Sequence, residues 1–242
     1  MEKTLQTLRW YLSQYMARLL LIALLCAVGG VILSDLAFYS TGGYELKNVV
    51  QTLPYELIAT VFAWIAGGSF FIPQFKMALA NGVSRKTYLL ACLPAIAAFA
   101  AALSIFGLIL AWVHSLFWPA VLITNVLYPL NGWFGVALVQ FAAYFLMTVF
   151  GCFIAILMYR SNGLARWVLL LAPVWFYIIL VADASDAGRV MQALIGYLRL
   201  TLGFVVMEAP NPYIAVLSLS VYAFITSGII YLMMRRVPLK ME

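Results

Sequence analysis

The sequence contains very little charge. Only 9% of its 242 residues are Asp, Glu, Lys or Arg, whereas soluble globular domains contain about one-quarter. The hydrophobic share is 66% and the mean hydropathy is +1.05. Too few polar side chains are present to cover a surface that faces water. These values predict an integral membrane protein.

Residues that carry chemistry are equally scarce. The single histidine is His114, and the three cysteines, Cys26, Cys92 and Cys152, lie in apolar runs without CxxC spacing. A Ser-His-Asp triad, an HExxH zinc site and a GxxxxGK[ST] phosphate loop are all missing from the sequence. We therefore expect no catalytic residue, no metal site and no cofactor in this chain. We interpret the cysteines as packed thiols and His114 as an interfacial residue.

The net charge of +6 does not indicate a nucleic-acid partner here. The sequence has no RNA- or DNA-binding motif, and basic residues commonly flank membrane spans on the cytoplasmic side. We expect contact with membrane lipids and no contact with nucleic acid.

Six apolar stretches are long enough to cross a bilayer as helices, which takes about 20 residues. Continuous runs of this length favour helices over the alternating strands of a membrane barrel. The predicted fold is an all-α integral membrane protein with one transmembrane domain, residues 1–242. The predicted spans are 19–40, 55–74, 88–112, 132–158, 166–183 and 212–234.

Lys and Arg predict the orientation of these spans. If the N-terminus is inside, only Lys47, Arg189 and Arg199 of the fourteen basic residues fall outside. All acidic residues except Glu2 and Glu242 then fall outside. The sequence thus predicts a multi-pass protein of the cell membrane with both termini in the cytoplasm.

The N-terminal residues 1–18 carry leucines at helical spacing, with basic residues on the other side. This pattern predicts an amphipathic helix in the inner membrane interface. The alternative is a plain cytoplasmic extension of the first span.

The predicted outer segment 184–211 contains a stretch, 190–207, that is long enough to span. A span there would place Arg199 near the middle of the bilayer, at a cost of about 2.5–3.5 kcal/mol. We instead expect re-entrant or interfacial short helices on the outer face, hinged near Gly196 or Gly203.

Polar and small residues within the spans suggest helix contacts. Gln140, Tyr144 and Thr148 recur at steps of four, so they either line a substrate path or form hydrogen bonds between helices, and the second reading is favoured. Gly67-Gly68-Ser69 would allow a close helix approach, and Pro73 is expected to end or kink the second span.

Residues 75–90 form a basic break between the second and third spans. Phe75 to Ala80 should continue a helix, Asn81-Gly82 is a typical helix end, and Ser84 is a typical N-cap. Arg85 and Lys86 then fall in the first helical turn, where basic groups oppose the helix dipole. Such a placement suits contact with an acidic partner or with anionic lipid headgroups.

This stretch, F-x-x-A-L-x-N-G-V-S-R-K-T, resembles the cytoplasmic loop of ABC-2 type permeases, particularly the small bacterial ones. The predicted layout is similar to that family as well: an N-terminal interfacial helix, six spans, a coupling helix and outer re-entrant helices. The matching residues are Phe75, Ala78, Leu79, Asn81, Gly82, Val83, Ser84, Arg85, Lys86 and Thr87.

The resemblance implies the membrane subunit of an ATP-binding cassette exporter. Such a permease pairs with a second copy or a related permease, and cytoplasmic ABC ATPase subunits that bind ATP and Mg²⁺ dock beneath it. Segment 75–87 would be the cytoplasmic coupling helix. Its ATPase-coupling interface would comprise Phe75, Lys76, Leu79, Asn81, Gly82, Val83, Ser84, Arg85 and Lys86.

The resemblance also implies export, of a lipid, a peptide or an antimicrobial compound. Few charges within the spans favour a hydrophobic or amphipathic cargo. One alternative is a membrane anchor or sensor that partners an ATPase without transporting anything. Another is a secondary transporter or channel, which would need buried acids or an internal repeat.

Overall fold

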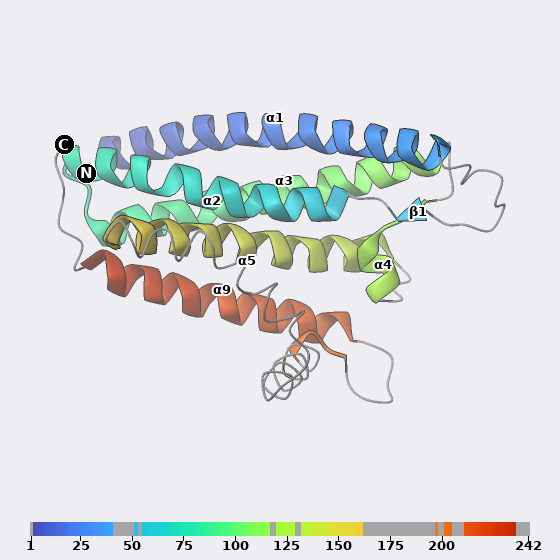
Figure 1. Ribbon diagram of the computed structural model, residues 1–242. Coiled ribbons are helices and arrows are strands. Elements are labelled where there is room, and N and C mark those ends of the chain that lie inside the picture. The colour runs from blue at the N-terminus through green and yellow to red at the C-terminus, as the bar shows by residue number, and fades with distance from the viewer. Residues whose placement is uncertain are drawn as a thin grey trace.

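A computed structural model of the chain is a bundle of long helices (Figure 1). It describes residues 2–40, 51–52, 55–116, 120–128, 132–161, 197, 201–204 and 211–235. The elements are α1 (Glu2–Ser40), β1 (Gln51–Thr52), α2 (Tyr55–Ala80), α3 (Arg85–Ser115), β2 (Ala120–Val121), α4 (Ile123–Leu127), α5 (Trp133–Arg160) and α9 (Pro212–Arg235).

Five of these helices, α1, α2, α3, α5 and α9, are long and apolar enough to cross a membrane. This confirms an all-helical chain with several membrane-spanning helices, and the five match five of the six predicted spans. The sixth predicted span, 166–183, lies outside the described residues. So does most of the predicted outer segment 184–211.

The helix α1 is continuous from Glu2 to Ser40. No break separates residues 2–18 from the predicted first span at 19–40. The structure therefore shows no helix break at residue 18, and the position of residues 2–18 relative to a membrane stays a prediction. Without a helix-breaking residue before Gly29, nothing in the sequence forces the chain to turn.

The helix α2 continues beyond the predicted second span at 55–74. Pro73 lies inside it, and the helix ends at Ala80. Proline removes one amide donor from the ladder, which a membrane helix packed against its neighbours tolerates. The predicted helical continuation from Phe75 to Ala80 is confirmed.

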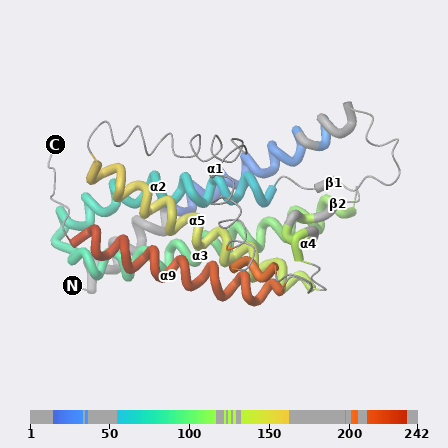
Figure 2. The backbone as a smooth tube through the Cα atoms, turned by 60° about the horizontal axis from the view of Figure 1, so that its bottom comes forward, coloured from blue at the N-terminus to red at the C-terminus, as the bar shows by residue number. Residues whose placement is uncertain are grey.

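The helices α2 and α5 form the centre of the bundle. The helix α5 packs against α2, α3 and α9, while α1 covers α2 and α3; Figures 1 and 2 show α9 on the side of the bundle opposite α1. Large apolar side chains on the outer faces of α1 and α9, such as Leu25 and Leu217, are exposed. In a bilayer these faces contact lipid rather than water.

Small residues let α2 and α5 approach closely, as predicted from Gly67. A Cβ atom added to Gly67 would lie 1.9 Å from the main-chain oxygen of Thr148. One added to Gly151 would lie 2.1 Å from the main-chain oxygen of Trp64. Lipid gives helices little hydrophobic reason to associate, so van der Waals contact of this kind stabilises the bundle.

The two cysteines nearest the centre are buried, as expected of packed thiols. Cys92 and Cys152 are 0% and 1% exposed, and neither forms a disulfide. Cys26 differs, because it is exposed on α1. Its helix packs along only one face, so a residue on the opposite face remains outside the core.

Short elements gather at the end of the bundle where α3 ends and α5 begins. The strands β1 and β2 pair in parallel, and α4 follows β2. Gly203, from the predicted outer segment, has a φ of +78°, a conformation that glycine adopts without strain. Tyr128 donates a hydrogen bond to the main-chain oxygen of Leu202, 2.7 Å away, and its ring packs on Phe204.

Candidate functional site

The connection between α2 and α3, residues 81–84, is called here the α2–α3 turn. It begins with a Schellman helix end. The amide of Gly82 donates to the oxygen of Leu79 at 3.0 Å, and the amide of Val83 donates to the oxygen of Ala78 at 3.0 Å. Gly82 has a φ of +75°, which glycine adopts without strain. The predicted helix end at Asn81-Gly82 is confirmed.

The helix α3 begins at the predicted N-cap, Ser84. The Ser84 Oγ accepts a hydrogen bond from the amide of Thr87 at 3.1 Å and lies 2.7 Å from the hydroxyl of Thr87. Its backbone is extended, as an N-cap requires. Arg85 and Lys86 are therefore the first residues of α3. A Schellman motif followed at once by an N-cap leaves this turn little conformational freedom.

Three aromatic rings hold α2 and α3 together beneath the turn. Phe71 and Phe75 stack at 6.3 Å between centroids, and Tyr88 packs against both at 5.5 and 5.4 Å. The hydroxyl of Tyr88 donates to the main-chain oxygen of Phe71 at 2.8 Å. All three rings are buried. The α2–α3 turn is thus fixed to the end of a packed helical hairpin.

Two basic side chains connect this hairpin to other helices. The guanidinium of Arg85 donates to the main-chain oxygen of Met234, in the last turn of α9. The ammonium of Lys76 lies 5.4 Å from the ring centroid of Tyr159, near the end of α5. Figure 1 shows the ends of α5 and α9 beside the α2–α3 turn.

We call this end of the molecule the basic end, because the ends of α2, α3, α5 and α9 that meet there contain Lys76, Arg85, Lys86, Arg160 and Arg235. The sequence contains no Asp or Glu between Glu56 and Asp183, or between Glu208 and Glu242. The described ends of α2, α3, α5 and α9 that meet there therefore carry basic side chains and no acidic one.

The residues predicted to contact an ATPase divide into three groups by their exposure. Phe75 and Val83 are only 1% and 8% exposed and pack within the chain, so they are not available to a partner. Their apolar side chains fill the space between α2 and α3, which the sequence pattern did not reveal. Lys76, Leu79 and Arg85 are partly buried. The exposed members are Asn81, Gly82, Ser84 and Lys86.

The polar stripe on α5 lies inside the bundle. Gln140, Tyr144 and Thr148 are at most 2% exposed. Gln140 forms a hydrogen bond to another helix, the favoured reading, whereas the hydroxyl of Thr148 bonds within α5 to the oxygen of Tyr144 at 2.8 Å. The hydroxyl of Tyr144 is buried without a hydrogen-bond partner. These side chains are packed rather than arranged along an open passage.

The partner of Gln140 is Glu56, a buried acid in the first turn of α2. Its carboxylate accepts from Nε2 of Gln140 at 2.6 Å, from the amide of Thr124 at 2.9 Å and from the hydroxyl of Thr124. Thr124 lies at the start of α4, so the carboxylate joins α2, α4 and α5. Glu56 also lies at two helix N-termini, where negative charge is favourable. The sequence pattern does not indicate these contacts of Glu56.

The single histidine, His114, also has a partner that the sequence did not indicate. Its Nε2 lies 3.2 and 3.3 Å from the two carboxylate oxygens of Asp35. The pair links the end of α3 to α1. Within the described part of the chain, no group of three or more His, Cys, Asp or Glu side chains is placed to hold a metal ion.

Comparison with known proteins finds no relative of this chain. No protein-family model, no curated protein and no solved structure matches the chain. A functional conclusion must therefore come from the residues themselves.

Proposed function

We propose that the chain is the membrane-spanning subunit of an ATP-binding cassette exporter, of the ABC-2 permease type. One observation carries the proposal: the motif that resembles the family's coupling loop forms a short, doubly capped turn between two long apolar helices. The cap residues Gly82 and Ser84 belong to the motif itself. The basic side chains beside them suit an acidic groove on a partner.

In this proposal the basic end faces the cytoplasm of the cell, and both termini lie there. The ATPase subunits bind ATP and Mg²⁺ and contact the exposed side of the α2–α3 turn, with Lys86 orienting the contact. Phe75 and Val83 do not contact the ATPase; they fix the turn to the hairpin. The sixth span, 166–183, completes the subunit, and a second copy or a related permease completes the transporter.

The packing suggests how movement of the ATPase would reach the membrane. The α2–α3 turn is joined to its hairpin by the rings of Phe71, Phe75 and Tyr88, and to α9 through Arg85. A force on a stiff turn moves the attached helices, whereas a flexible loop would absorb it. Alternating access of this kind would export a hydrophobic or amphipathic cargo, such as a lipid, a peptide or an antimicrobial compound.

The test is purification of the tagged chain from the cells that produce it, with the co-purifying proteins examined for an ABC ATPase. We expect wild type to retain the ATPase and to stimulate ATP hydrolysis, and Lys86→Glu to lose both. Arg18→Glu is the matched control, because Arg18 is also an exposed basic residue but lies on α1. If Lys86→Glu retains and stimulates the ATPase like wild type, the α2–α3 turn is not the coupling element. Retention without transport in reconstituted vesicles would instead indicate an anchor or sensor.

A secondary transporter is the second candidate, because the buried acid Glu56 is a feature of such proteins. Its three hydrogen bonds within the chain suit a structural role better. Transport driven by a proton gradient without ATP, lost in Glu56→Gln, would favour this candidate over the exporter.

A further inference from the structure

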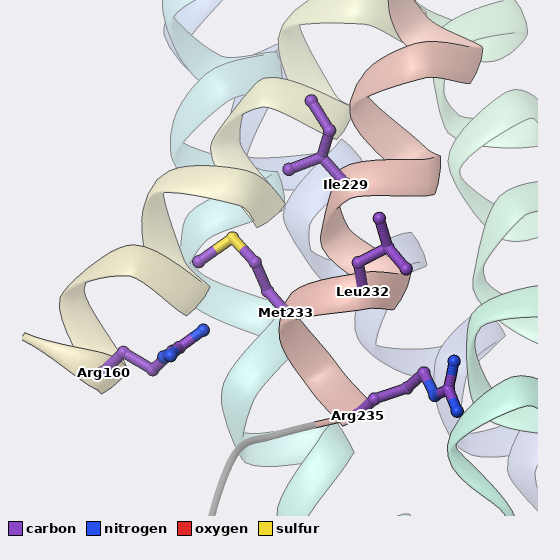
Figure 3. Close-up of a pocket in the computed structure, with 5 residues that line it drawn as sticks. All are labelled: Arg160, Ile229, Leu232, Met233 and Arg235. Carbon is purple, nitrogen blue, oxygen red and sulfur yellow. The ribbon is translucent and has the colours of Figure 1, made fainter.

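A pocket of about 550 Å³ lies at the basic end, between the last turns of α5 and α9. Its size is within the range of about 300–1,000 Å³ that small-molecule sites occupy. Among the described residues, its lining comprises Arg160 from α5 and Ile229, Leu232, Met233 and Arg235 from α9. Figure 3 shows Ile229, Leu232 and Met233 along the last turns of α9, with Arg160 and Arg235 below them at the ends of α5 and α9 and the Arg235 side chain directed away from Arg160.

The two arginines are available to a ligand. Arg160 and Arg235 are exposed, and neither has a hydrogen bond or an ion pair within the described part of the chain. Arg85, the nearby cation on α3, differs because its guanidinium is bonded to the oxygen of Met234. An arginine in the last turn of a helix interacts favourably with the helix dipole. The position of Arg160 and Arg235 at helix ends would therefore not indicate a ligand site by itself.

The apolar side chains that line the pocket, Ile229, Leu232 and Met233, are the second observation that indicates a ligand site. Ile229 and Leu232 are 42% and 60% exposed although they line the pocket. They precede Arg235 by six and three residues, which corresponds to roughly 9 and 4.5 Å along the helix axis. The pocket is thus positively charged near Arg235 and apolar a few ångströms along the helix. This distance is similar to the one between a lipid headgroup and the first carbons of its acyl chains.

We propose that this pocket binds an anionic phospholipid. Arg160 and Arg235 would attract its anionic headgroup from two sides, since arginine matches the geometry of phosphate oxygens. The first carbons of its acyl chains would lie on Ile229, Leu232 and Met233. The site joins α5 to α9, and it does not depend on an ATPase partner.

A lipid explains these features better than free phosphate or an acidic protein does. Free phosphate would leave the apolar wall exposed. An acidic protein surface would contact the arginines from the aqueous side and would also leave Ile229 and Leu232 uncovered. A lipid covers both parts at once, and the ends of five apolar helices place the site where headgroups lie.

The experiment is native mass spectrometry of the purified chain, titrated with phosphatidylglycerol or with phosphatidylcholine of the same acyl chains. We expect wild type to prefer phosphatidylglycerol by about tenfold or more, because each basic residue near an anionic headgroup contributes on the order of a factor of five. The double variant Arg160→Gln, Arg235→Gln should lose this preference. The double variant with lysine at both positions should keep most of it.

The matched control is Lys86→Gln with Arg18→Gln, which removes two exposed charges that do not line the pocket. It should keep the preference, and inorganic phosphate in millimolar excess should not displace the lipid. The proposal is overturned if the glutamine variant at 160 and 235 still prefers phosphatidylglycerol. It is equally overturned if the control loses the preference to the same extent, or if phosphate competes.

Discussion

Arg85, the first residue of α3, donates a hydrogen bond to the main-chain oxygen of Met234, 149 residues later in the chain. The carbonyls of a last helical turn have no partner within their own helix, and they lie at the negative end of the helix dipole. Arg85 satisfies one of them from a neighbouring helix. Arg85 of the basic motif therefore stabilises the chain itself, in addition to any contact that the motif makes with a partner.

Replacing Arg85 by Gln should weaken the attachment of α9 to the hairpin. Loss of a charge-assisted hydrogen bond that is partly buried should cost about 1–2 kcal/mol. For a chain of this size that corresponds to a fall in the melting temperature of about 2–8 °C. Thermal unfolding in detergent, followed by tryptophan fluorescence, measures it.

The control for this prediction is Lys86→Gln. Lys86 is exposed and carries the same charge one residue later, so its replacement should leave the melting temperature nearly unchanged. Equal effects of the two substitutions would mean that the charge, and not the bond to Met234, stabilises this end.

The turn itself was predictable from sequence because its signals are local. Asn81-Gly82 and Ser84 act through their own backbone and the residues within four positions, so a reader of the sequence can locate them. The bond from Arg85 to Met234 was not predictable, since a main-chain oxygen carries no side-chain signature. The burial of Phe75 was missed for a related reason: its ring is enclosed by Tyr88, from the next helix.

The close contact of α2 and α5 leads to a prediction with a neighbouring control. Gly67→Ala would place a methyl group 1.9 Å from the oxygen of Thr148, so the two helices must separate. We expect a loss of about 1–3 kcal/mol, as in overpacked cores. At Gly68 the nearest atom to an added methyl, the oxygen of Gly151, is 3.7 Å away. Gly68→Ala should therefore be tolerated, and equal loss from both substitutions would contradict the observed helix contact.

Glu56 should matter for the attachment of α4. In Glu56→Ala the donors of Thr124 and Gln140 lose their acceptor in a buried site, which should cost about 2–4 kcal/mol. Glu56→Gln should cost less, because its amide oxygen can still accept. Unfolding in detergent measures the loss in free energy of unfolding. Faster proteolysis within 120–128 than in wild type would show that α4 is less firmly attached. Thr60 lies one turn further along α2, and its hydroxyl donates to the main-chain oxygen of Glu56, not to the carboxylate. Thr60→Ala should therefore have little effect on stability.

The pair of His114 and Asp35 gives a prediction about the attachment of α1 to the bundle. The two side chains are 6% and 25% exposed, so water screens the pair only in part. In a double-mutant cycle with His114→Phe and Asp35→Asn, we expect each single substitution to destabilise the chain. The double variant should be less destabilised than the sum of the two by about 1–2 kcal/mol.

Ser115→Ala is the control for this cycle. Ser115 is the next residue of α3, and its hydroxyl bonds only to the oxygen of Trp112 in the same helix, at 2.7 Å. It should therefore show no coupling to Asp35→Asn. If the effects of His114→Phe and Asp35→Asn simply add, the 3.2 Å contact contributes nothing to stability. In that case α1 would be held to α2 and α3 by packing around Ala23 and Ala27, which are 2% and 1% exposed.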